Sequence, residues 1–99
     1  MAIVKLTPAA DLDLLEIWYI SDDRWDTEQA DTYLRKLDAR MTFLANNPKR
    51  GRLRKELPGH PMSYHEERHT IFYRRIKTGI EVIRLLHNSM DFSRHLGNS

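Results

Sequence analysis

The segment over residues 69–87 constrains the fold most, because it has the form of two β-strands joined by a very short turn. The runs His69–Ile76 and Ile80–His87 are rich in β-branched and aromatic residues, and the tight turn Lys77-Thr78-Gly79 separates them. A connection this short joins antiparallel strands. The second run is apolar on both faces apart from Glu81 and Arg84, which predicts a central strand.

Two helices are predicted ahead of this hairpin. Thr7 is a good N-cap and Pro8 suits the first helical position, so the first helix is expected from Pro8 to Arg24. Its core-facing stripe comprises Ala10, Leu14, Ile17, Trp18 and Ser21. A second set widens the apolar surface, namely Leu12, Leu15 and Tyr19. Either the rest of the domain covers this second set, or a partner protein does.

The second helix is expected over Thr27–Asn46. Asp26 and Gln29 have the spacing of a capping box, and Asn46-Asn47-Pro48 ends the helix. The short joint at Trp25-Asp26 makes the two helices an antiparallel hairpin. This helix has the cleanest periodicity in the chain, with a stripe of Ala30, Tyr33, Leu34, Leu37, Met41 and Leu44.

Two further strand-length runs complete the expected fold, Ala2–Leu6 and Met62–Glu66. The segment Pro48–Pro61 between the helices and the later strands is expected to be a loop. The order β-α-α-β-β-β predicts one α+β domain over residues 1–99, a two-layer arrangement with the helical hairpin on one face of a small, mainly antiparallel sheet. The other face of the sheet is expected to be more open to solvent or to a partner.

The charges are unevenly distributed along the chain. Residues 1–48 hold 5 Lys/Arg and 9 Asp/Glu, a net charge of −4, whereas residues 49–99 hold 11 and 5, a net charge of +6. Five of these cations fall within Lys49–Lys55. A basic half of this kind favours an acidic partner or a phosphate backbone, although a solvated connecting loop would have the same composition.

Composition excludes several classes of site. The chain has no cysteine, so disulfides, zinc–thiolate sites and thiol nucleophiles are absent, which agrees with a cytoplasmic protein. No apolar run approaches the roughly 20 residues that span a bilayer, and the N-terminus does not have the pattern of a secretion signal. In 99 residues the core is thin, so no cofactor is expected. The histidines at 60, 65 and 69, with Glu66 and Glu67, lack a recognised ligand spacing, so no metal is expected either.

Metal-independent RNA cleavage remains possible from the residue types present. It requires a general base, a general acid and cations for the developing charge. His87 or His95 would be the acid or base, Tyr73 a stacking or proton-donating group, and Arg84, Arg94 or Arg68 the cations. Against this site, strand alternation points Arg84 and His87 to opposite faces. In the alternative interpretation His87 hydrogen-bonds to Asp91 and fixes the tail. Alternation also separates Phe72 from Tyr73, so one should be core and the other an exposed contact residue.

Three segments in order resemble toxins of the RelE/ParE superfamily, closest to the ParE branch. They are LTPAADLDLLEIWYI at 6–20 with Arg24-Trp25, EQADTYLRKLDARMTFLANNPKRGR at 28–52, and RHTIFYRRIKTGIEVIRLLHNSMD at 68–91. The resemblance covers nearly the whole chain. In one respect the chain departs from it, because ParE-like sequences commonly carry two arginines between the histidine that ends the last strand and the following aspartate. Here the stretch reads Asn88-Ser89-Met90.

The resemblance implies the toxin of a type II toxin–antitoxin module, which inhibits DNA gyrase by binding and is neutralised by a ParD-like antitoxin in a hetero-oligomer. The implied gyrase-contacting or tail-ordering residues are Arg68, Arg74, Arg84, His87, Asp91 and Arg94, on one exposed surface. The antitoxin would cover the helical hairpin and a sheet edge, through apolar positions such as Leu12, Leu15 and Tyr19. Two alternatives stay open. One is a RelE-like, ribosome-dependent mRNA endonuclease, and the other is a non-toxic member that keeps only the fold and antitoxin binding.

Overall fold

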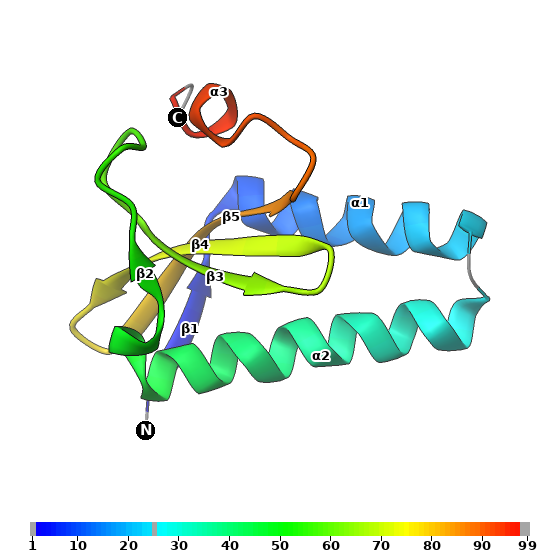
Figure 1. Ribbon diagram of the computed structural model, residues 1–99. Helices are drawn as coiled ribbons and strands as arrows, with labels where there is room; N and C mark the ends of the chain where they lie inside the picture. Colours follow the sequence, from blue (N-terminus) through cyan, green and yellow to red (C-terminus); the bar gives the residue numbers. More distant parts are fainter. Residues whose placement is uncertain (1, 25, 98–99) are drawn as a thin grey trace.

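The protein is a helical hairpin packed on a curved five-stranded sheet (Figure 1). The computed structural model describes residues 2–24 and 26–97. The chain forms β1 (Ile3–Leu6), α1 (Pro8–Arg24), α2 (Thr27–Asn46), a 3₁₀ turn η1 (Pro48–Arg50), β2 (Arg52–Leu53), β3 (Met62–Glu66), β4 (His69–Ile76), β5 (Gly79–His87) and α3 (Phe92–Leu96). The predicted α+β class and the order β-α-α-β-β-β are confirmed, with β2 and α3 as additions.

The helix boundaries follow from their caps. The backbone N–H of Ala10 donates to Thr7 Oγ1 at 3.1 Å, and that of Gln29 donates to Asp26 Oδ1 at 2.9 Å. Asn47 is the C-cap of α2, and its backbone N–H donates a hydrogen bond to Phe43 O. The predicted bounds of both helices are therefore confirmed. Trp25, at the expected joint, lies outside the described residues.

The strand order is β1-β5-β4-β3-β2, with β1 parallel to β5 and every other neighbouring pair antiparallel. The strand predicted to be central, β5, is an interior strand between β1 and β4. A bulge interrupts its pairing, because Phe72 pairs with Arg84 but Tyr73 pairs with Val82, which leaves Ile83 as the extra residue. Beyond Val82, β5 has no β1 neighbour.

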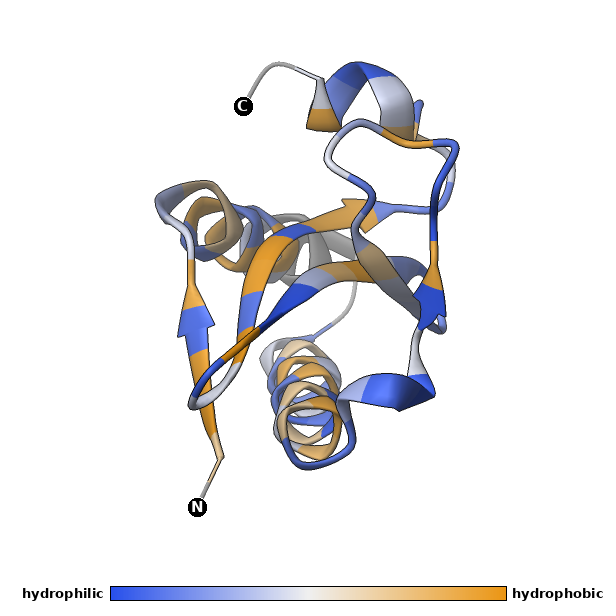
Figure 2. Cartoon of the chain, turned by 90° about the vertical axis from the view of Figure 1, so that its left-hand side faces the viewer, coloured by the Kyte–Doolittle hydropathy of each residue, from blue (hydrophilic) through white to orange (hydrophobic). Residues whose placement is uncertain are grey.

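Both faces of the sheet carry buried side chains. On the helical face, α1 and α2 bury the larger core, which includes Ile17, Leu37, Leu44, Ile71 and Tyr73. The predicted periodic stripe of α2 lies against it. Figure 2 shows the apolar stretches of β4 and β5 between these helices and α3.

The second face is not open as expected. Leu57 from the segment after β2 and Leu96 from α3 cover Phe72 and Leu86, so a smaller second core forms there. Phe72 and Tyr73 do point to opposite faces, but both are fully buried. The expectation that one of them is an exposed contact residue is therefore wrong, because a loop and a five-residue helix that sequence periodicity did not predict cover the second face.

Candidate functional site

The outer face of α1 is an uncovered apolar stripe. Leu12, Leu15 and Tyr19 are 60%, 55% and 69% exposed, whereas Ala10 and Ile17 on the opposite side of the helix are buried. Residues at i, i+3 and i+7 share one helix face. The domain's own elements therefore do not cover this stripe, so the first of the two predicted alternatives, in which they do, is wrong.

A buried carboxylate joins α1 to the irregular part of β5. Asp13 Oδ2 accepts hydrogen bonds from Arg84 Nε at 2.8 Å and from Leu85 N at 2.9 Å, and Asp13 Oδ1 accepts one from Arg84 NH2 at 2.9 Å. The carboxylate thus accepts the hydrogen bond of Leu85 N–H, which β1 cannot accept because β1 pairs with β5 only as far as Val82. Asp13, which the sequence analysis did not single out, holds Arg84 in an internal contact and raises the pKa of its guanidinium.

A tyrosine and two histidines meet where β4 and β5 approach α2. Tyr33 Oη lies 2.6 Å from His69 Nδ1. The rings of His69 and His87 pack edge to face, with 5.3 Å between their centroids. Burial, followed by the charges of the neighbouring His87 and Arg68, lowers the pKa of His69 to about 4. Burial also raises the pKa of Tyr33 to about 12. Both groups are therefore neutral at pH 7, and the cluster acts as a hydrogen-bonded packing contact.

The segment after β5 is ordered differently from the expectation. His87 Nδ1 contacts Ser89 Oγ at 2.7 Å and accepts from Ser89 N, so its partner is Ser89 and not Asp91. Asp91 instead caps α3 by accepting from Arg94 N at 3.3 Å. Asp91 therefore orders the tail by capping α3, as one of its two expected roles required.

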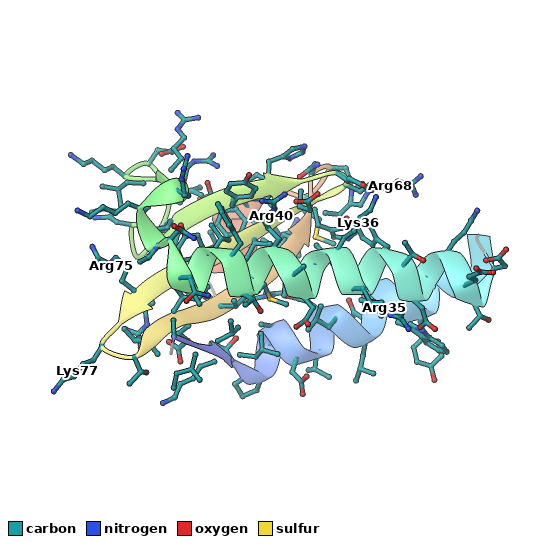
Figure 3. The ribbon with its side chains drawn as sticks, turned by 90° about the horizontal axis from the view of Figure 1, so that it is seen from below. Arg35, Lys36, Arg40, Arg68, Arg75 and Lys77 are labelled. Carbon is teal, nitrogen blue, oxygen red and sulfur yellow. The ribbon has the colours of Figure 1, made fainter. Side chains whose placement is uncertain are left out.

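The six implied gyrase-contacting residues do not share one exposed surface. Arg68 lies in the β3–β4 turn, at the opposite end of the sheet from Arg75 and Lys77 (Figure 3). Arg74 precedes Arg75 on β4 and pairs with Glu81 through its Nε. Arg84 is held by Asp13. Of the remaining residues, Arg68 lies in the β3–β4 turn, His87 ends β5, Asp91 directly precedes α3 and Arg94 lies within α3.

Two of the candidate nuclease residues, Tyr73 and Arg84, are committed to internal contacts. Tyr73 is fully buried, and its hydroxyl donates to Pro48 O at 2.8 Å and accepts from Gly51 N at 3.0 Å. Arg84 is held by Asp13. The described residues therefore do not bring Tyr73, Arg84, His87 and Arg94 together around one reactive position.

A cleft lies between the first half of α2 and the β3–β4 turn. It has a volume of about 550 Å³, and Tyr33 and the ion pair between Lys36 and Glu67 are part of its lining. Within residues 2–24 and 26–97, no group of three or more His, Cys, Asp or Glu side chains is placed to hold a metal ion. No helix in that part of the chain is long and apolar enough to cross a membrane.

Comparison with known proteins places the chain in a family. Residues 4–92 match the family model described as "ParE toxin of type II toxin-antitoxin system, parDE". The chain belongs to the ParE toxin family. It is 43% identical over 93 residues to Toxin ParE1 of Mycobacterium tuberculosis, covering 92% of this chain and 94% of the relative. It is 37% identical to Toxin ParE1 of Caulobacter vibrioides, covering 94% and 96%.

A solved structure titled "Chromosomal ParDE TA system from P. aeruginosa" contains a similar chain. Its TM-score is 0.74 over 88% of this chain and 96% of that one, at 21% sequence identity. At this identity the likeness concerns the fold. The resemblance to the ParE branch inferred from the three sequence segments is thus confirmed by the family match, and the fold by the structural one.

Proposed function

We propose that this protein is the toxin of a ParDE-type module, that an antitoxin neutralises it by covering the outer face of α1, and that it inhibits DNA gyrase by binding. Membership of the ParE family supports the module. The observation that carries the antitoxin site is the apolar stripe of Leu12, Leu15 and Tyr19, which the domain itself leaves exposed. Large exposed apolar side chains in a row mark a protein–protein interface more often than ordinary surface.

The gyrase contact is proposed for the end of the sheet that carries Arg68 and His87, together with Arg94 in the short helix α3 that follows β5. The two segments involved are tied together, because Asn88 N donates to Arg68 O at 2.9 Å and Asn88 Nδ2 donates to Glu67 O at 3.0 Å. Asp91 contributes by capping α3 and so ordering the segment. Arg74 and Arg84 are given no contact role, since Glu81 and Asp13 already hold them.

The antitoxin site is tested with the protein encoded by the adjacent reading frame. In Leu12→Ser/Leu15→Ser, each substitution removes a side chain whose burial is worth about 1.5–3 kcal/mol, so the dissociation constant should rise at least about 100-fold. Leu53→Ser is the matched control, because Leu53 is 48% exposed on β2, at the other edge of the sheet. Calorimetric titration with the antitoxin measures the dissociation constants of the double variant and of the control. Equal affinity of the double variant and the wild type would remove the α1 site from the proposal.

The target is tested by inducing the toxin alone in cells and assaying supercoiling by purified gyrase. Filamentation with an SOS response and loss of supercoiling support the proposal. Immediate arrest of translation with cut transcripts would replace it by the nuclease alternative, and normal growth by the non-toxic one. Arg68→Gln and Arg94→Gln should weaken gyrase inhibition while antitoxin binding stays unchanged.

A further inference from the structure

A basic groove lies on the second face of the sheet, away from α1 and α2. Its volume is about 380 Å³, within the range of roughly 300–1,000 Å³ that ligand sites occupy. Five separate parts of the chain line it: β2, the segment after β2, β3, β4 and the segment that follows β5 into α3. The lining residues are Arg52, Arg54, Ser63, His65, Thr70, Asn88 and Phe92.

Strand register explains why polar groups converge there. Arg52 pairs with Ser63 across β2 and β3, and His65 pairs with Thr70 across β3 and β4. Ser63 and His65 are two positions apart on one strand, so they project from the same face. Cross-strand partners also share a face, which places all four side chains together.

Arg54 is held in place along one side of the groove. Its Nε donates to Glu56 Oε2 at 2.8 Å, its NH1 donates to Ser63 Oγ at 3.3 Å, and its guanidinium carbon lies 5.9 Å from the centre of the Phe92 ring. The NH2 group has no hydrogen bond to any described residue. A pre-oriented guanidinium with spare donors is suited to binding an oxyanion, because less side-chain entropy is lost on binding.

Arg52 supplies a second cation. Its side chain is exposed, and none of the described residues forms an ion pair or hydrogen bond with it. The surrounding segment continues this charge with Lys49, Arg50 and Lys55, whereas Glu56 is the one acid between residues 48 and 61. Figure 2 shows η1 and the start of β2 as a hydrophilic stretch at this edge of the molecule.

The balance of donors and acceptors identifies the ligand class. The guanidinium groups donate only, and two of the groove's potential acceptors are already used: Asn88 Oδ1 accepts from Thr70 Oγ1 at 2.7 Å, and Ser63 Oγ accepts from Arg54 NH1. A peptide strand would bring N–H donors that need acceptors in the groove. A phosphodiester backbone brings acceptors alone, and Arg binds phosphate with several N–H groups at once.

We propose that this groove binds the phosphodiester backbone of a single nucleic-acid strand. A flexible strand enters a recess between β2 and α3 with its phosphates toward Arg52 and Arg54. The proposal stands on the groove alone and does not depend on the antitoxin or on gyrase.

The test is fluorescence anisotropy of the full-length protein with a labelled oligothymidylate about twelve nucleotides long, a length within the usual site size of single-strand binders. Arg52→Gln is the lead variant, because Arg52 has no internal contact to lose. We expect it to weaken binding about tenfold and to reduce the slope of log affinity against log salt by about 0.7, the value for one phosphate contact on a single strand. Arg52→Gln/Arg54→Gln should reduce the slope by about 1.4.

The matched control is Arg35→Gln, which removes the same charge from α2 (Figure 3). It should change affinity less than about twofold if binding is local to the groove, since distant exposed charges are screened. Equal losses in Arg35→Gln and Arg52→Gln would overturn the proposal in favour of general charge attraction. So would absence of binding at low salt, tighter binding of a blunt duplex of the same length, or equally tight binding of oligoglutamate. Circular dichroism checks that each variant is folded.

Discussion

Removing the carboxylate of Asp13 should destabilise the domain more than any surface substitution. Asp13 accepts three hydrogen bonds, two from the Arg84 guanidinium and one from Leu85 N. The side chain of Asp13 is 8% exposed and that of Arg84 is 24% exposed. Asp13→Ala therefore leaves a mostly buried cation and a strand N–H without their acceptor.

The expected cost follows from these exposures. Breaking a buried ion pair from one side costs about 3–5 kcal/mol, because the remaining charge is uncompensated. Water still reaches part of Arg84, so we expect the lower end, about 3 kcal/mol. For a domain of this size that corresponds to a fall in Tm of about 12–24 °C. Asp13→Asn keeps one oxygen acceptor and should cost about half as much.

The assay is urea unfolding at pH 7, with a double-mutant cycle between Asp13→Ala and Arg84→Met. The two side chains share their bonds, so the double variant should lose about 2 kcal/mol less than the sum of the single ones. Asp38→Ala, at an exposed position of α2, is the control and should stay within about 0.5 kcal/mol of the wild type. A loss below about 1 kcal/mol for Asp13→Ala, or a coupling within the error of the cycle (about 0.5 kcal/mol), would refute this account of the contact.

Three further changes test other parts of the fold. The pKa of His69 is lowered from 6.5 to about 4, so stability should be complete above pH 6.5 and fall as the pH drops toward 4. His69→Gln should remove about 1–2 kcal/mol of that fall in urea titrations, allowing for the partial exposure of the ring. In Gly51→Ala the new Cβ would lie 2.1 Å from Tyr73 Oη and 2.9 Å from Ser63 O, so unfolding should become easier by about 2 kcal/mol. Tyr73→Phe should not rescue this variant, because the Ser63 contact remains. In Gly79→Ala the Cβ would lie 2.0 Å from Ile3 O, so β1 should detach and its amides should exchange faster than those of β4, while unchanged exchange in β1 would contradict the close approach.

The sequence predicted those parts of the fold that depend on local patterns. The bounds of α1 and α2 follow from Thr7, Asp26 and Asn47, whose capping roles act within one helical turn. The strands β3, β4 and β5 follow from apolar runs of strand length. By contrast, β2 has two residues and α3 has five, which is too short for a periodic signal. Asp91 as an N-cap was the one local indication of α3.

The candidate site could be predicted only in part, because burial is a tertiary property. Periodicity identified two apolar sides of α1, but it could not decide which one the domain covers. Asp13 was missed because acidic helix residues are usually solvated. The available signal was its position in the helix. Asp13 comes three residues after Ala10 and four before Ile17, so it lies on the same face of α1 as these two buried residues. The bulge at Ile83 and the short β1 together create the need for that carboxylate, and neither is visible in the sequence.

The two proposed surfaces lie on different sides of the sheet, and this separation makes them independently testable. The stripe of Leu12, Leu15 and Tyr19 belongs to α1 over the first face, whereas Arg52 and Arg54 line the second face. An antitoxin segment confined to α1 leaves the groove accessible, so the toxin–antitoxin complex should bind the oligothymidylate as tightly as the free toxin. If antitoxin abolishes that binding, the antitoxin must extend around the sheet edge to β2 or carry its own acidic segment into the groove. The first result would separate neutralisation from nucleic-acid binding, and the second would make the groove part of the neutralised surface.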